Sequence, residues 1–124
     1  MPSSLADIEA VRAVVQKYMD ACAAADASWL RAALHPSWTM YGVDALGTDV
    51  ASTVNDFVTW VAEQPPPVDY RAAITHVDVS GVVASVTVVE ENYYGLDYVI
   101  CFTLVRYGAE WALVTKSYSQ IPPQ

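Results

Sequence analysis

Cationic side chains are scarce in this sequence. Its 124 residues include six Lys and Arg against 14 Asp and Glu, which gives a formal net charge of −8 and a sequence pI near 4.3. Proteins that bind nucleic acid or anionic membranes neutralise phosphates with Lys and Arg. We therefore expect no nucleic acid and no membrane as a partner, and we interpret the acidity as a contribution to solubility.

Cysteine and histidine are also scarce, and their spacing excludes several kinds of site. Cys22 and Cys101 form no CxxC pattern and no zinc spacing, so we expect two buried, reduced thiols. His35 and His76 have no nearby ligand cluster, so we expect no metal. The sequence has no phosphate-binding loop, no dinucleotide glycine fingerprint and no nucleophile elbow, and we expect no cofactor.

No apolar run is long enough to span a bilayer, because the longest are of strand length and interrupted. The opening residues, MPSSLADIE, lack the basic and apolar regions of a signal peptide, so we expect a cytoplasmic location. Apolar residues are nevertheless abundant, at 54% of the chain. In a single domain spanning residues 1–124, such a proportion indicates that some apolar side chains line a cavity or a subunit interface.

The N-terminal part has helical periodicity. Ser4 and Asp7 form a Ser-x-x-Asp box, and apolar residues then recur at helical spacing, which predicts a helix over residues 5–24. Asp26 is a good N-cap for a second, shorter helix, which Pro36 ends. A third helix is expected to open at Gly47 and Thr48, with a buried stripe before three prolines end it. That stripe contains Val50, Val54, Phe57, Val58 and Val61.

The remaining segments have strand character. One short strand is predicted over residues 38–43, and four longer ones follow the third helix, separated by turns. The four span residues 70–79, 82–94, 98–106 and 111–119. Helices followed by a run of strands predict an α+β fold with a mainly antiparallel sheet, curved into a cone with an apolar interior. The strand 98–106 is apolar on both faces, so we expect a homodimer in which a second subunit covers the outside.

Two segments carry a family resemblance. The C-terminal segment contains I-x-x-V-D-V-S-G, F-T-L-V and E-W-x-L-V-x-K, and it resembles the sheet of the lumazine-binding branch of NTF2-like (SnoaL-like) proteins. The segment VQKYMDACAAADASWLRAALHPSW resembles the first two helices of that superfamily. It is also similar to the start of ketosteroid isomerases, with Tyr18 where they carry a catalytic tyrosine. The resemblance implies a cone of three helices packed on a curved sheet.

The sequence departs from these relatives at the carboxylates. The general-base aspartate of ketosteroid isomerases would fall near Gly42, and an aspartate common in the lumazine-binding branch would fall at Ile100. Steroid isomerisation is therefore not supported. The scaffold also hosts cyclases, dehydratases, hydrolases and proteins without catalytic activity, so the fold does not select a reaction.

Two residues are the main candidates for chemistry. Tyr18 faces inward by helical period, and a buried phenol can donate to a developing oxyanion; the alternative is a core tyrosine. Glu90 shares strand parity with the small apolar residues Ala84, Val86 and Val88, which points it into the cone. Desolvation of a carboxylate favours its neutral form and suits it to acid or base chemistry; the alternative is a strand-end glutamate in water.

Other candidates have stronger structural alternatives. His35 suits general base work but also a helix C-cap, and Asp44 lies where this scaffold often has catalytic groups but also reads as a turn residue. Aromatic residues are expected to form pocket wall and core. They are Trp38, Tyr41, Trp60, Tyr98 and Phe102.

These residues lead to three hypotheses. The first is a cofactor-free enzyme that transfers a proton on a small apolar or aromatic molecule, as an isomerase, cyclase or dehydratase. Tyr18 would stabilise the oxyanion, and Glu90, His35 or Asp44 would move the proton. The second is a small-molecule binding protein without catalysis, and the third is an interaction domain whose sheet dimerises.

Overall fold

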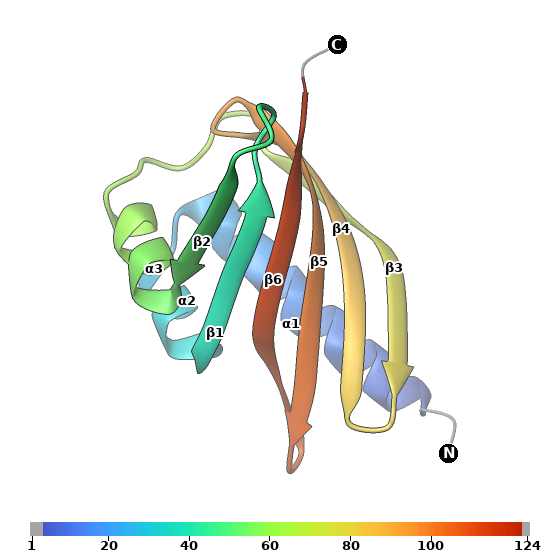
Figure 1. Ribbon diagram of the computed structural model, residues 1–124. Coiled ribbons are helices and arrows are strands. Elements are labelled where there is room, and N and C mark those ends of the chain that lie inside the picture. Colours follow the sequence, from blue (N-terminus) through green and yellow to red (C-terminus); the bar gives the residue numbers. More distant parts are fainter. Residues whose placement is uncertain (1–3, 123–124) are drawn as a thin grey trace.

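The computed structural model describes residues 4–122, which form three helices and six strands (Figure 1). The longest helix, α1 (Leu5–Ala24), crosses behind the sheet in the view of Figure 1. In chain order the elements are α1 (Leu5–Ala24), α2 (Ala27–Ala33), β1 (Leu34–Val43), β2 (Asp49–Thr53), α3 (Val54–Ala62), β3 (Arg71–Ser80), β4 (Val83–Tyr93), β5 (Leu96–Tyr107) and β6 (Glu110–Ile121).

The six strands form one sheet in the order β2-β1-β6-β5-β4-β3. Only the β1–β6 pair is parallel, and the other four pairs are antiparallel. The sheet curves around the helices, which lie on one side of it (Figure 1). The predicted α+β architecture, with three helices on a curved, mainly antiparallel sheet, is therefore confirmed.

Side chains at the helix starts explain where the helices begin. The Ser4 hydroxyl accepts a hydrogen bond from the Asp7 backbone N–H at 3.1 Å, and the Asp26 carboxylate accepts one from the Trp29 N–H at 3.0 Å. These bonds satisfy N–H groups that have no partner within the helix. Among residues 4–122, no helix combines the length and apolarity needed to cross a membrane.

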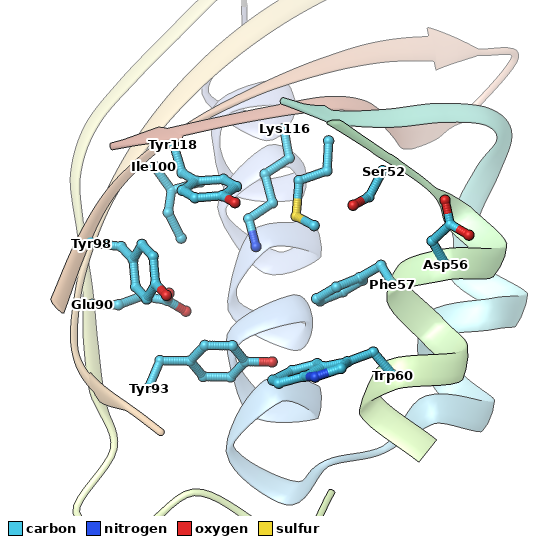
Figure 2. Close-up of a pocket in the computed structure, with 11 residues that line it drawn as sticks. Ser52, Asp56, Phe57, Trp60, Glu90, Tyr93, Tyr98, Ile100, Lys116 and Tyr118 are labelled. Carbon is cyan, nitrogen blue, oxygen red and sulfur yellow. The ribbon is translucent and has the colours of Figure 1, made fainter. Parts of the chain in front are cut away.

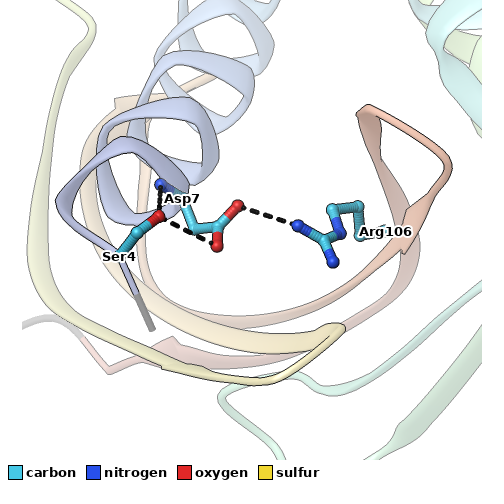
Figure 3. A network of polar contacts seen from close by, with 3 residues as sticks. All are labelled: Ser4, Asp7 and Arg106. Carbon is cyan, nitrogen blue, oxygen red and sulfur yellow. Dashed lines mark hydrogen bonds and ion pairs between the residues drawn. The ribbon is translucent and has the colours of Figure 1, made fainter. Parts of the chain in front are cut away.

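The first turn of α1 is also tied to the sheet. Asp7 accepts a hydrogen bond from the Ser4 hydroxyl, and its other oxygen pairs with the Arg106 guanidinium of β5 at 3.3 Å (Figure 3). Both side chains are partly exposed, so this pair adds little stability on its own. The pair links the N-terminal turn of α1 to strand β5.

The segment before α3 differs from the prediction. Residues 49–53 form the edge strand β2, in which Val50 pairs with Gly42 of β1, and no helix opens at Gly47 and Thr48. The helix begins only after Thr53, because Thr53 and Asp56 form a complete capping box. The preceding strand is also longer than expected, since β1 already starts at Leu34.

Four of the strand pairs contain a register shift, and those in β4 and β6 change which of their residues face the helices. In β6, Leu113 pairs with Leu104 and Thr115 with Thr103, so Val114 is an extra residue that reverses the alternation. A second extra residue follows Glu90 in β4. Because strand side chains alternate between faces, each bulge moves the downstream residues to the opposite face.

The outer face of the sheet is not covered by the helices. Cys22 is buried in α1, whereas Cys101 of β5 lies on the outer face and is exposed. The expectation of two buried thiols is therefore wrong for Cys101. The reason is that the helices pack on one face only, so alternate residues of a strand that is apolar on both faces remain outside.

Trp111 opens β6 and is buried, with 7% of its surface exposed. We predict that Trp111→Ala lowers the free energy of unfolding by roughly 3–5 kcal/mol, since truncation removes apolar contacts and leaves a cavity. Urea denaturation of the two proteins measures this difference. Tyr107→Ala, at an exposed position, is the control. Equal free energies of unfolding for Trp111→Ala and the parent protein would contradict the prediction.

Candidate functional site

A cavity of about 320 Å³ opens between α3 and the inner face of the sheet (Figure 2). Helix α3 supplies one wall, and strands β4, β5 and β6 supply the facing wall. The lining residues are Met40, Ser52, Asp56, Phe57, Trp60, Glu90, Tyr93, Tyr98, Ile100, Lys116 and Tyr118. This volume lies at the small end of the range of about 300–1,000 Å³ typical of ligand pockets.

Five of the eleven residues that line the cavity are aromatic. Tyr98 and Tyr118 meet edge to face with ring centroids 5.4 Å apart, and Trp60 lies 6.1 Å from Tyr93. Figure 2 shows these rings surrounding the space into which the polar side chains extend. Flat, apolar walls of this kind suit a small ring system.

Glu90 is the buried carboxylate of the cavity. Its side chain comes from β4 and is 2% exposed, whereas the neighbouring Glu91 is exposed. The Tyr70 hydroxyl donates a hydrogen bond to Glu90 Oε2 at 2.5 Å. The predicted register of β4 thus holds as far as Glu90, and the carboxylate reaches the cavity rather than bulk water.

Lys116 is the buried cation of the cavity. Its Nζ atom comes from β6, and the residue is 5% exposed. Nζ donates a hydrogen bond to the Tyr18 hydroxyl at 3.0 Å. Three aromatic rings surround the ammonium, with Nζ 4.9 Å from the Phe57 centroid, 5.4 Å from Tyr18 and 5.8 Å from Tyr118.

The two buried charges do not neutralise each other by direct contact. Within residues 4–122, the ion pair between Arg106 and Asp7 is the only one within 4.0 Å, and it lies at the start of α1. Glu90 and Lys116 enter the cavity from different strands (Figure 2). Each is hydrogen-bonded to a tyrosine, Glu90 to Tyr70 and Lys116 to Tyr18. The cavity lining therefore contains a buried carboxylate and a buried ammonium that do not pair directly with each other.

The phenols and the thiol around these charges are held in their neutral forms. Burial raises the pKa of Tyr18 well above its ordinary value of 10.0, and it also raises the pKa of Tyr70 and Tyr93, with Glu90 adding to each shift. Burial likewise raises the pKa of Cys22 to about 12 and that of Tyr98 to about 12. The Tyr93 hydroxyl is buried and has no hydrogen-bond partner in the described part of the chain.

The structure brings some of the candidate residues together. Glu90, Trp60 and Tyr98 line the cavity. Tyr18 is fully buried behind Lys116 and contacts the cavity through that side chain. The functional roles assigned to these residues are proposals that geometry alone does not test.

The other candidates lie elsewhere. Trp38 and Phe102 are core residues that pack on Phe57 and Tyr18, respectively. Tyr41 is half exposed and donates to Asp49 at 2.8 Å.

Both alternative proton carriers also lie outside the cavity lining. The Asp44 carboxylate accepts from the N–H groups of Leu46 and Thr48 in the turn before β2. His35 stacks on Tyr107 with ring centroids 5.5 Å apart, and its Nδ1 accepts from the Ser37 N–H. Their catalytic roles stay predictions, and the contacts of both side chains are those of local structure.

Sequence reasoning missed Lys116, Tyr118 and Tyr93. Counting from Trp111 and Leu113, simple alternation puts residue 116 outside, and only the extra residue Val114 turns it inward. Tyr93 follows the bulge of β4 in the same way. The available signal for Lys116 was its type, since a lysine within an apolar strand requires a partner or a function.

Gly42 marks a further difference from the ketosteroid isomerase pattern. A Cβ atom at this position would lie 2.4 Å from ring carbons of Tyr118, which pairs with Gly42 across the β1–β6 ladder. The Tyr118 ring therefore fills the space that a side chain at residue 42 would need. Among residues 4–122, no three His, Cys, Asp or Glu side chains gather as a metal site would require.

The buried phenols predict a loss of stability at alkaline pH. Their folded-state pKa values are raised, so their contribution is complete below the ordinary pKa near 10.0 and is lost as the pH rises above it. We expect the urea midpoint to fall steadily from about pH 9 to about pH 11. Tyr18→Phe should flatten this decline, whereas Tyr107→Phe, at an exposed ring, should not; equal slopes in all three proteins would contradict the interpretation.

Comparisons with known proteins agree with this architecture. The chain is similar to an NTF2-like protein of unknown function from Shewanella baltica OS155, at 22% identity, with 99% of this chain and 100% of that chain covered and a TM-score of 0.88. An NTF2-like protein of unknown function from Methylobacillus flagellatus KT gives 24% identity, 97% and 96% coverage and a TM-score of 0.87. A ketosteroid isomerase-like protein from Erwinia carotovora atroseptica SCRI1043 gives 16% identity, 97% and 100% coverage and a TM-score of 0.72.

At these identities the structural likeness shows the fold alone. No curated protein sequence matches the chain. The family model described as "Putative lumazine-binding" matches residues 6–119, which include every residue that lines the cavity. The chain therefore belongs to this lumazine-binding family, and its fold is that of the NTF2-like superfamily.

Proposed function

We propose that this protein is a cofactor-free enzyme that transfers a proton on a small aromatic or apolar carbonyl compound, in the manner of an isomerase, cyclase or dehydratase. One observation carries the proposal: a buried carboxylate and a buried ammonium line the same aromatic cavity without pairing with each other. An acid–base reaction needs a group that takes a proton and a group that stabilises the resulting charge.

Glu90 is the proposed base. A carboxylate takes a proton from carbon most effectively when water is excluded, because hydration no longer stabilises its charge. The Tyr70 hydroxyl occupies one carboxylate oxygen and thereby orients the side chain, which leaves the other oxygen for the substrate. The same carboxyl group can return the proton at a neighbouring atom, which completes an isomerisation without any cofactor.

Lys116 is the proposed electrostatic partner. Proton removal beside a carbonyl shifts negative charge onto the oxygen, and a preorganised cation in a water-poor cavity stabilises that charge strongly. Tyr18 was expected in this role by itself. Because its hydroxyl accepts from Lys116 Nζ and does not line the cavity, we propose Tyr18 as a positioning residue that acts through Lys116.

Substitution of the proposed base tests this mechanism. Glu90→Gln keeps the shape but removes proton transfer, so we expect deuterium exchange from D₂O into the carbon next to the carbonyl of aryl ketones to fall about 100-fold or more. Nuclear magnetic resonance follows this exchange. Glu91→Gln is the matched control, since Glu91 is the next residue of β4 and is exposed; equal exchange by the two variants would remove Glu90 from the mechanism.

A second candidate function is small-molecule binding without catalysis. It is favoured by Gly42, because Tyr118 fills the space where ketosteroid isomerases would carry their base. A binding protein would bind aryl ketones, but neither the parent protein nor any variant would exchange deuterium into them above the background rate. If the protein is an enzyme, the parent protein exchanges deuterium into the ketone, whereas Glu90→Gln still binds the ketone but no longer exchanges it. The same experiment therefore distinguishes the two functions.

We also propose that the protein forms a homodimer through the outer face of the sheet. Small apolar and hydroxyl side chains pair across β4 and β5 on this face, including Val89 with Val99 and Thr87 with Cys101. The three helices leave this face uncovered, and an apolar sheet face is stable when a second layer packs on it.

Light scattering measures the assembly directly. We expect a mass of twice 13.5 kDa at micromolar concentration, and Cys101→Arg should shift it toward the monomer because it buries an unpaired charge in the interface. Ala23→Arg adds the same charge at an exposed position of α1 and should leave the mass unchanged. A monomeric parent protein would refute the dimer.

A further inference from the structure

We infer that the natural ligand of the cavity is an aromatic acid, whose anionic oxygens bind Lys116 while its rings occupy the space between Glu90 and helix α3. The inference takes the cavity from the proposed function, on which it rests for the location of the site. It adds the charge and the orientation of the ligand. The argument starts from how the ammonium is held.

Lys116 is surrounded by rings and not by carboxylates. The faces of Phe57, Tyr18 and Tyr118 attract a cation through their electron-rich centres, and all three ring centroids lie within 6 Å of Nζ. Its one hydrogen bond goes to the neutral Tyr18 hydroxyl. An ammonium has three donors, and the remaining ones are open to a molecule in the cavity.

A buried charge that makes no direct ion pair with a described residue favours a charged partner over a neutral one. Burial removes the hydration of the ammonium, and a hydrogen bond between two ions is roughly twice as strong as one between neutral groups. A neutral carbonyl oxygen offers a dipole only, whereas a carboxylate compensates the whole charge. An anion bound at Lys116 would form a buried ion pair, and separating such a pair is costly.

Lys116 has no competing cation in the described lining of the cavity. Lys116 is the only Lys or Arg among the described residues that line the cavity, and the chain as a whole carries a net charge of −8. Lys17 is the only other lysine of the sequence and lies exposed on α1. Within the cavity lining, an anionic ligand thus has one attractive charge to approach.

The carboxylates of the cavity set the orientation. Glu90 extends from the sheet side and Asp56 lies on α3, where its carboxylate accepts from the Thr53 N–H (Figure 2). Both repel an anion, so the acid group points to Lys116 and the uncharged part of the ligand lies beside Glu90. In the proposed mechanism the acid group is then the carbonyl group, so Lys116 stabilises the charge that moves onto its oxygens when Glu90 takes a proton from a conjugated C–H group.

Matched acid and amide probes test the inference. trans-Cinnamate and trans-cinnamamide have the same shape and differ in charge, and isothermal titration calorimetry gives both dissociation constants. We expect the wild-type protein to bind the acid at least tenfold more tightly than the amide. Lys116→Met should abolish this preference, and Lys17→Met, the matched control, should retain it.

The affinities of the wild-type protein for the two probes can be compared without any variant, so this measurement tests the inference even if Lys116→Met does not fold. Equal affinity for the two probes, failure of the acid to bind at millimolar concentration, or an acid preference that survives in folded Lys116→Met would each overturn the inference. Glu90→Gln should keep the acid preference. An acid preference together with no deuterium exchange in any protein would support the ligand class and refute the proposed enzymatic function.

Discussion

The hydrogen bond between Lys116 Nζ and the Tyr18 hydroxyl joins the first helix to the last strand in the interior of the molecule, across 98 positions of the sequence. The cavity depends on this contact, because it determines where the only cation of the lining points. Both partners are buried, and the rings around them replace water in holding the charge. Any change that separates α1 from β6 would therefore alter the site and the core together.

Two bulges make this arrangement possible. An extra residue at Val114 turns Lys116 and Tyr118 toward the helices, and an extra residue after Glu90 turns Tyr93 toward the same space. Without them, these side chains would lie on the outer face, and the cavity would lose its cation and two of its aromatic walls. Before Glu90, where the alternation of β4 is uninterrupted, the residues that face the helices are small and apolar.

The charge arrangement also separates this chain from the pattern of ketosteroid isomerases. The space near Gly42 is filled by Tyr118, and the buried carboxylate of the cavity, Glu90, comes from β4. In the proposed mechanism, the base therefore approaches the substrate from a different wall of the scaffold. The fold permits either arrangement, since it supplies the enclosed space and leaves the chemistry to individual side chains.

Local patterns in the sequence determined much of the fold. The Ser4 and Asp26 caps, the apolar periodicity of α1 and the parity of β4 up to Glu90 each follow from contacts within a few residues. The edge strand β2 was missed because Val50 and its neighbours suit a helix as well, and only pairing with β1 selects the strand. Lys116 and Tyr93 were missed for a related reason. A bulge is set by the partner strand, so which face a downstream residue occupies is decided by tertiary structure and is not encoded in the alternation of a single strand.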